Sequence, residues 1–208
     1  MDELRLTLVT DRAQTGGREL VPVVQECLAA GLPAVQLREK DLGAAELARL
    51  GHALRALTAE HRALLIVNDR VDVALAVGAD AVQRTSTSLP IADILAVSDK
   101  RLRVGASVHS VAEAVAAAEA GADWIVFGPV YDTPSKRLYG PPQGLGLLAE
   151  VARAVPIPVI AVGGITPERV DAVRKAGAHG VAVISAILAA PSPAAATRRF
   201  LTELAATP

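Results

Sequence analysis

The 208 residues are 51% hydrophobic but include only one Trp, two Tyr and two Phe, and the formal net charge is −1. Without a basic block or many aromatic rings, the chain lacks what general nucleic-acid binding needs to displace counterions and stack bases. No apolar run of about 18 residues and no charged-then-apolar leader is present, and the lone Cys27 excludes an intramolecular disulfide, so we expect a cytoplasmic protein without a membrane partner.

Short, mostly β-branched runs alternate with amphipathic, Ala-rich stretches along the chain. Several runs are apolar without alternation, which is typical of parallel strands covered on both faces. Between them, apolar residues recur at helical spacing, although the stretch around 91–97 shows this least clearly. The expected strands are Leu6–Val9, Ala34–Leu37, Leu64–Val67, Ala81–Gln83, Val104–Val108, Trp124–Phe127, Val159–Val162 and Val181–Ile184.

A faint repeat supports this count of strands. Gly31, Gly78, Gly121 and Gly177 each end a helical stretch shortly before a strand, as expected of glycine in the left-handed position after a helix. Eight strands alternating with helices predict one (β/α)8 TIM barrel over residues 1–208, with an open doubly wound sheet as the alternative. Ser192 and Pro193 are expected to begin the last helix, and Cys27 to be buried.

Residues that directly follow the strands of such a barrel gather at the face where ligands bind. After the second strand, a period of two places Gln36, Arg38 and Lys40 on one side. Two cations there suit an anionic, diphosphate-like ligand. Alternatively, they form salt bridges with Glu39 or Asp41 in a solvated loop.

The third strand runs into Asn68-Asp69-Arg70. A carboxylate here can hold a Mg²⁺ ion that bridges phosphate oxygens, because Mg²⁺ takes one or two protein carboxylates and keeps several waters. Alternatively, Asp69 caps the next helix or pairs with Arg70.

The fifth strand brings Ser107 and His109 to one face, and Ser110 can cap the following helix. His109 is either a catalytic acid or base or a hydrogen-bonded structural group. The long loop after the sixth strand carries Thr133, Ser135 and Lys136, which can grip a phosphate or lie at a disordered surface.

The last two strands predict a phosphate site. Gly163-Gly164 follows the seventh strand, Thr166-Pro167 opens a helix, and Ser185 follows the eighth strand. Barrels often bind phosphate between these two loops, where glycine lets the backbone approach the oxygens.

Together these segments resemble the family of thiamine phosphate synthases and TenI-type thiazole tautomerases over about residues 5–190. Eight modest motifs in this order are specific for the family. The motifs are Leu8-Val-Thr-Asp11, Gln36-Leu-Arg-Glu-Lys40, Val67-Asn-Asp-Arg70, Ser107-Val-His109, Gly121-Ala-Asp-Trp-Ile-Val-Phe-Gly-Pro129, Thr133-Pro-Ser-Lys136, Val162-Gly-Gly-Ile165 and Val183-Ile-Ser-Ala-Ile187.

The resemblance implies a synthase that joins hydroxymethylpyrimidine diphosphate to hydroxyethylthiazole phosphate and releases diphosphate. By resemblance, the pyrimidine diphosphate is held by Gln36, Arg38, Lys40 and Asn68, and Ser107 lies near the pyrimidine. The resemblance also implies that Asp69 binds Mg²⁺ and that Lys136 steadies the departing diphosphate. The thiazole phosphate would be received by Thr133, Ser135, Gly164, Ile184 and Ser185. The candidate catalytic residues are Arg38, Lys136, Ser107 and His109.

Two segments depart from the family pattern. In the synthases, the segment after the fourth strand resembles His-x-Gly-Gln followed by acidic residues. In this chain the same segment reads Gln83-Arg-Thr-Ser-Thr-Ser-Leu-Pro90 and has no carboxylate. Some tautomerases have a catalytic His where this chain has Pro129. A synthase therefore remains the first reading, with a TenI-type tautomerase and a non-catalytic thiazole phosphate-binding regulator as alternatives, and the metal count and a homo-oligomer left open.

Overall fold

The computed structural model describes residues 2–133 and 141–206. Eight parallel strands close into a barrel in which each strand pairs with the next one along the chain and β8 pairs with β1. This confirms the TIM barrel and excludes the open sheet, and each strand boundary lies within one residue of the expected one. The strands are β1 (Leu6–Val9), β2 (Ala34–Leu37), β3 (Leu64–Asn68), β4 (Ala81–Arg84), β5 (Arg103–Val108), β6 (Trp124–Phe127), β7 (Val159–Val162) and β8 (Gly180–Val183).

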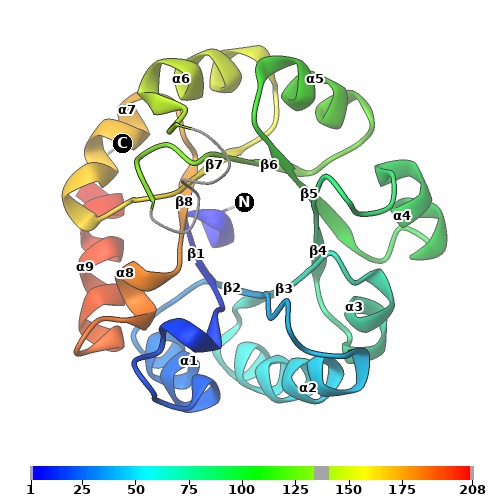
Figure 1. The fold of residues 1–208 in the computed structure, drawn as a ribbon, viewed down its shortest axis with the longest axis vertical. Coiled ribbons are helices and arrows are strands. Elements are labelled where there is room, and N and C mark those ends of the chain that lie inside the picture. Colours follow the sequence, from blue (N-terminus) through cyan, green and yellow to red (C-terminus); the bar gives the residue numbers. More distant parts are fainter. Residues whose placement is uncertain (1, 134–140, 207–208) are drawn as a thin grey trace.

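Helices surround the barrel (Figure 1). They include one at Ile91–Val97, where the sequence pattern was least clear. The α-helices are α1 (Leu20–Ala29), α2 (Ala44–His61), α3 (Val71–Val77), α4 (Ile91–Val97), α5 (Val111–Glu119), α6 (Gly144–Ala154), α7 (Val170–Lys175), α8 (Ser185–Leu188) and α9 (Pro193–Ala206), and the 3-10 helices include η1 (Asp2–Leu4), η2 (Arg12–Gln14) and η4 (Pro167–Arg169).

The helix ends follow the sequence. Glycines 31, 78, 121 and 177 all have φ between 67° and 96°, which confirms their left-handed role after helices. Ser192 accepts a hydrogen bond from the Ala195 N–H at 3.3 Å, and Pro193 is the first residue of α9, as expected. Cys27 is fully buried, also as expected.

Two apolar cores follow from strand periodicity. The larger core lies between strands and helices, and the smaller one fills the inside of the barrel. The inner core contains small residues such as Ala34 and Ala81 beside Trp124, the one Trp of the chain. Leu4 of η1 also belongs to it and is fully buried.

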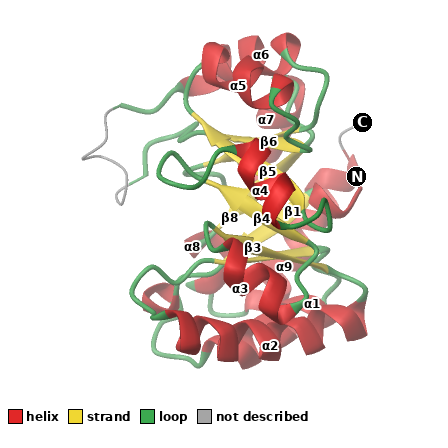
Figure 2. Ribbon diagram, turned by 90° about the vertical axis from the view of Figure 1, so that its right-hand side faces the viewer, coloured by secondary structure: helices red, strands yellow, loops and turns green. Residues whose placement is uncertain are grey.

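The two ends of the barrel differ in what covers them. Figure 2 shows α8 and the loop after β6 on the left, where the strands end, and η1 at the opposite side. The left side is therefore the face at which the polar residues of the sequence pattern converge. Within the described ranges, no helix is both long and apolar enough to cross a bilayer.

Candidate active site

Polar side chains from β2 to β5 lie on the inner side of the barrel at its carboxyl end. Gln36 pairs in register with Ile66, which belongs to the inner core, and Asn68 pairs with Gln83. Gln83 pairs in turn with Gly105, two residues before Ser107. Because side chains alternate along a strand, these polar residues share the inward face one layer above the inner core.

Arg12, rather than Arg38 or Lys40, forms the ion pairs with Glu39 and Asp41. Its guanidinium lies 3.2 Å from Glu39 and 2.8 Å from Asp41, and hydrogen bonding to Asp41 raises the pKa of Arg12. The alternative of salt bridges from Arg38 or Lys40 to these carboxylates is therefore wrong for the described structure. The reason is that η2 carries Arg12 against the loop after β2.

Arg38 follows β2 at the carboxyl end of the barrel, which we call the mouth, and its side chain can bind a ligand there. Its backbone N–H donates to the Thr10 hydroxyl at 2.9 Å, which holds the start of the loop against β1. Its half-buried guanidinium has no hydrogen-bond or ion-pair partner among residues 2–133 and 141–206. Lys40 is exposed. Both cations can therefore meet an anion that arrives from solvent.

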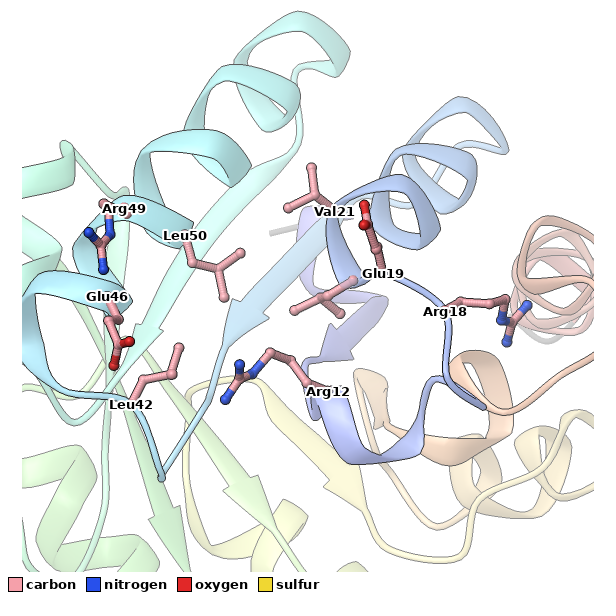
Figure 3. Close-up of a pocket in the computed structure, with 9 residues that line it drawn as sticks. Arg12, Arg18, Glu19, Val21, Leu42, Glu46, Arg49 and Leu50 are labelled. Carbon is pink, nitrogen blue, oxygen red and sulfur yellow. The ribbon is translucent and has the colours of Figure 1, made fainter.

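The groove in Figure 3 lies outside the barrel and is a separate feature. It encloses about 420 Å³ between the loop carrying Arg12, the start of α1 and the start of α2. Arg18 points away from Arg12 and donates to the carbonyls of Leu188 and Ala190 at 2.5 and 3.0 Å. None of the site residues expected from the sequence lines this groove.

Asp69 adopts the left-handed backbone conformation, with φ of 66°. Its N–H donates to the Gln83 carbonyl at 2.9 Å, and its carboxylate accepts a hydrogen bond from Ser88. Arg70 instead pairs with Asp72 and lowers the pKa of that carboxyl group. The sequence alternatives for Asp69, a helix cap or a pair with Arg70, are therefore wrong, since its carboxylate turns toward the loop after β4.

The loop after β4 contributes hydroxyl groups around Asp69. The Thr85 hydroxyl lies 3.0 Å from that of Ser88, and the Thr85 N–H donates to Ser88 at 2.9 Å. Within the described part of the chain, no three His, Cys, Asp or Glu residues form a metal-binding group. One carboxylate with neighbouring hydroxyls fits a Mg²⁺ ion that keeps several waters, rather than an all-protein cage.

Ser107 lies at the end of a buried hydrogen-bond chain. The side-chain amide nitrogen of Gln83 (Nε2) is 3.0 Å from the Ser107 hydroxyl, and the indole N–H of Trp124 donates to the side-chain amide oxygen of Gln83 (Oε1) at 3.1 Å. Gln83 and Trp124 are each 1% exposed, whereas Ser107 is half-buried. Ser107 is therefore the member of this chain that reaches the mouth.

His109 is tied to the neighbouring strand end. Its Nδ1 lies 2.6 Å from the carbonyl oxygen of Gly128, and because a carbonyl oxygen can only accept, Nδ1 carries a proton in this contact. Ser110 accepts a hydrogen bond from the Glu113 N–H at 3.2 Å and caps α5, as expected. His109 is exposed, and its contact with Gly128 holds the ring against the end of β6.

The loop after β6 packs directly on the loop after β7. The Tyr131 N–H donates to the Gly163 carbonyl at 3.1 Å. The guanidinium carbon of Arg169 lies over the Tyr131 ring, 4.4 Å from its centroid. A Cβ at Gly164, whose φ is 61°, would lie 2.7 Å from the Asp132 carbonyl oxygen. The glycine therefore admits a neighbouring loop, a role that its sequence position does not reveal.

The remaining expected residues lie in or near these loops. Thr133 donates to the Tyr131 carbonyl at 3.0 Å, Ile184 directly precedes α8, and exposed Ser185 begins it. Ser135 and Lys136 lie outside the described residues.

Sequence reasoning missed two features of this face. Arg12 and Glu39 are 27 positions apart, and nothing in their neighbourhoods predicts their pairing. The contact between Trp124 and Gln83 had a signal in Gly105, because a glycine inside a β-branched strand marks a close approach.

Comparison with known proteins gives a consistent result along almost the whole chain. The family model described as thiamine monophosphate synthase matches residues 6–187. The thiamine-phosphate synthase of Roseiflexus castenholzii is 46% identical over 92% of this chain and 84% of its own length, and that of Methanospirillum hungatei is 41% identical over 94% and 95%. The solved thiamine phosphate pyrophosphorylase of Pyrococcus furiosus superposes with a TM-score of 0.91 at 38% identity, covering 99% of this chain and 97% of that one.

Proposed function

Because the chain belongs to the thiamine monophosphate synthase family, we propose that it joins hydroxymethylpyrimidine diphosphate to hydroxyethylthiazole phosphate in thiamine biosynthesis and releases diphosphate. The observation that carries this proposal is the 41–46% identity to proteins named thiamine-phosphate synthase over more than nine tenths of the chain. The chain is accordingly a transferase.

The diphosphate binds at the carboxyl ends of β2 and β3. Arg38 offers a guanidinium without a protein partner among the described residues, and Lys40 adds an exposed charge. Gln36 and Asn68 lie on the inner side of the same strands and supply amide groups. An Arg fork combined with a Lys point charge suits diphosphate oxygens.

Asp69 and the hydroxyls beside it form the place for Mg²⁺. All of these donors are oxygen atoms, which Mg²⁺ prefers. When bound, the ion would supply positive charge to the diphosphate oxygens. Asp69 would hold it, and Ser88 keeps the carboxylate oriented.

The thiazole phosphate binds between the loops after β6, β7 and β8. Gly164, Ile184, Ser185 and Thr133 border this region, and the contact between Tyr131 and Gly163 holds two of the loops together. Ser135 and Lys136 lie outside the described residues. The family resemblance alone assigns Ser135 to the thiazole phosphate and Lys136 to the diphosphate.

Catalysis then rests on electrostatics and positioning. As the bond between the pyrimidine methylene and the diphosphate oxygen breaks, negative charge gathers on the leaving group, where Arg38 offers its guanidinium and where the family resemblance assigns Lys136. The thiazole nitrogen, held by its phosphate, forms the new bond to the methylene carbon. The substitution transfers no proton at these atoms, so the synthase reaction gives His109 no acid–base step; the tautomerase alternative requires one.

The test is an assay of the purified protein with both substrates and Mg²⁺, in which thiamine phosphate is measured. Product formation that chelation of Mg²⁺ abolishes supports the synthase and its metal. Faster isomerisation of the thiazole carboxylate phosphate without that product would reassign the chain to the tautomerase. Saturable binding of thiazole phosphate without either reaction would reassign it to a regulator. The cytoplasmic location and the oligomeric state stay predictions.

A further inference from the structure

A polar chain with a defined direction runs through the inside of the barrel. It begins at the indole of Trp124 on β6, passes through the amide of Gln83 on β4, and ends at the hydroxyl of Ser107 on β5, with steps of 3.1 and 3.0 Å. The first two members are 99% buried. Buried polar groups of this kind need their partners, because an unsatisfied one costs free energy.

The chemistry of Trp124 fixes this direction. An indole N–H can donate but never accept, so the Gln83 amide must turn its oxygen toward Trp124. The amide nitrogen then faces Ser107 and can only donate to it. As a result the Ser107 oxygen accepts, and its own proton points elsewhere. No other hydrogen-bond partner of this hydroxyl occurs among the described residues.

Ser107 is half-buried at the carboxyl end of β5, and the family resemblance implies that it lies near the pyrimidine. We propose that Trp124 and Gln83 are positioning residues that make Ser107 a hydrogen-bond donor toward the bound pyrimidine. A ring nitrogen is an acceptor and matches this donor, whereas a ring without an acceptor at that position leaves the hydroxyl unsatisfied. The relay therefore contributes to selection of the substrate ring. This inference rests on the proposed function for the identity of the ligand.

Gly105 makes the relay possible. A Cβ at this position would lie 2.3 Å from the Gln83 amide oxygen and 2.3 Å from the Trp124 indole nitrogen. Its φ is not in the left-handed region, so the reason for glycine here is space alone. Gly105→Ala would push the indole and the amide apart.

The relay can be tested without any substrate. The chain has one Trp, so ¹⁵N-labelled protein gives a single indole N–H resonance in its NMR spectrum. We expect that resonance to lie downfield and to exchange slowly with solvent, and to move upfield in Gln83→Met and Gly105→Ala. An indole resonance whose chemical shift is unchanged by both substitutions in folded protein would overturn the relay.

The role of Ser107 is tested by calorimetric binding of pyrimidine diphosphate substrate in the absence of thiazole phosphate. Gln83→Met and Ser107→Ala should each weaken its binding by roughly threefold to tenfold, the size of one hydrogen bond. The double variant should be no weaker than Ser107→Ala, because Gln83 acts through Ser107. Inorganic diphosphate, which has no ring, should bind all of these variants as it binds the wild type.

Other outcomes separate the two proposals. Additive losses, equal losses for inorganic diphosphate, or unchanged pyrimidine affinity in a folded Gln83→Met variant would overturn the positioning role. Should Gln83→Met fail to fold, Trp124→Phe keeps an aromatic ring in the core and removes the N–H donor, and the same binding pattern is expected. A wild type that binds inorganic diphosphate but neither binds pyrimidine diphosphate nor makes thiamine phosphate would refute the proposed function, while the indole resonance still reports on the relay.

Discussion

The hydroxyl of Ser88 donates a hydrogen bond to the carboxylate of Asp69, which joins the loop after β4 to the end of β3. The family pattern has acidic residues in the former loop, and this chain has hydroxyls instead. The hydroxyl of Ser88 adds no negative charge beside Asp69, whereas an acidic residue would.

Asp69→Asn should lower kcat by about 100-fold to 1000-fold, because the amide cannot supply the negative charge that attracts Mg²⁺. Initial rates over a range of Mg²⁺ concentrations would measure the loss. Asp72→Asn is the matched control, since that carboxylate is exposed and pairs with Arg70. Equal rates for the two variants would refute the metal role of Asp69.

Ser88→Asp should reduce the Mg²⁺ concentration for half-maximal rate by roughly tenfold, because a second carboxylate beside Asp69 strengthens the attraction for the cation. Without metal the two like charges repel, so the variant should melt at a lower temperature than the wild type unless Mg²⁺ is added. Thermal scans with and without Mg²⁺ give this comparison. A Tm that does not respond to Mg²⁺ in the variant would contradict the prediction.

Arg38→Met should weaken binding of inorganic diphosphate by roughly 10-fold to 100-fold, the size of charge-assisted hydrogen bonds, while stability stays nearly constant. Stability is spared because the guanidinium has no partner within the described residues. Arg199→Met removes a surface charge that pairs with Glu168 and serves as the control. A similar loss in both variants would mean that overall charge, rather than Arg38, attracts the ligand.

Gly164→Val should raise the KM for thiazole phosphate by at least about tenfold, because the new side chain collides with the Asp132 carbonyl and strains a left-handed backbone. The loop after β6 would then leave its place on the loop after β7. Steady-state kinetics with each substrate varied would show whether the effect is confined to the thiazole. Gly146→Val is the control, since nothing lies within 4 Å of a Cβ there; an unchanged KM in Gly164→Val would move the phosphate site elsewhere.

Burial raises the pKa of the Cys27 thiol from its ordinary value of 9.0 to about 11. The unfolded chain therefore loses this proton first as the pH rises. The stability contributed by the neutral thiol is fully present below about pH 9 and is lost on the way to about pH 11.

The loss should amount to roughly 2–3 kcal/mol in the free energy of unfolding. Urea denaturation at several pH values would measure it. In Cys27→Ala the decline between these pH values should be shallower, whatever the absolute stability of the variant. Parallel curves for the two proteins would contradict the prediction.

The sequence by itself determined the barrel and the face that carries the chemistry. Eight apolar runs spaced by amphipathic stretches, with glycines such as Gly78 after the helices, leave few ways to bury the apolar surface. The order of residues along the strands also places Gln36 on one side with Arg38, and Ser107 on one face with His109, because side chains alternate with a period of two.

Only the tertiary structure decided which polar groups meet. Arg12, rather than Arg38, binds Glu39; Ser88 binds Asp69; and Trp124 reaches Gln83 across 41 positions in the chain. Local periodicity fixes the direction of a side chain relative to its own strand, but partners on other strands depend on barrel register and loop packing. Hydrogen bonds act over about 3 Å, so a register shift of one residue would replace every one of these pairs.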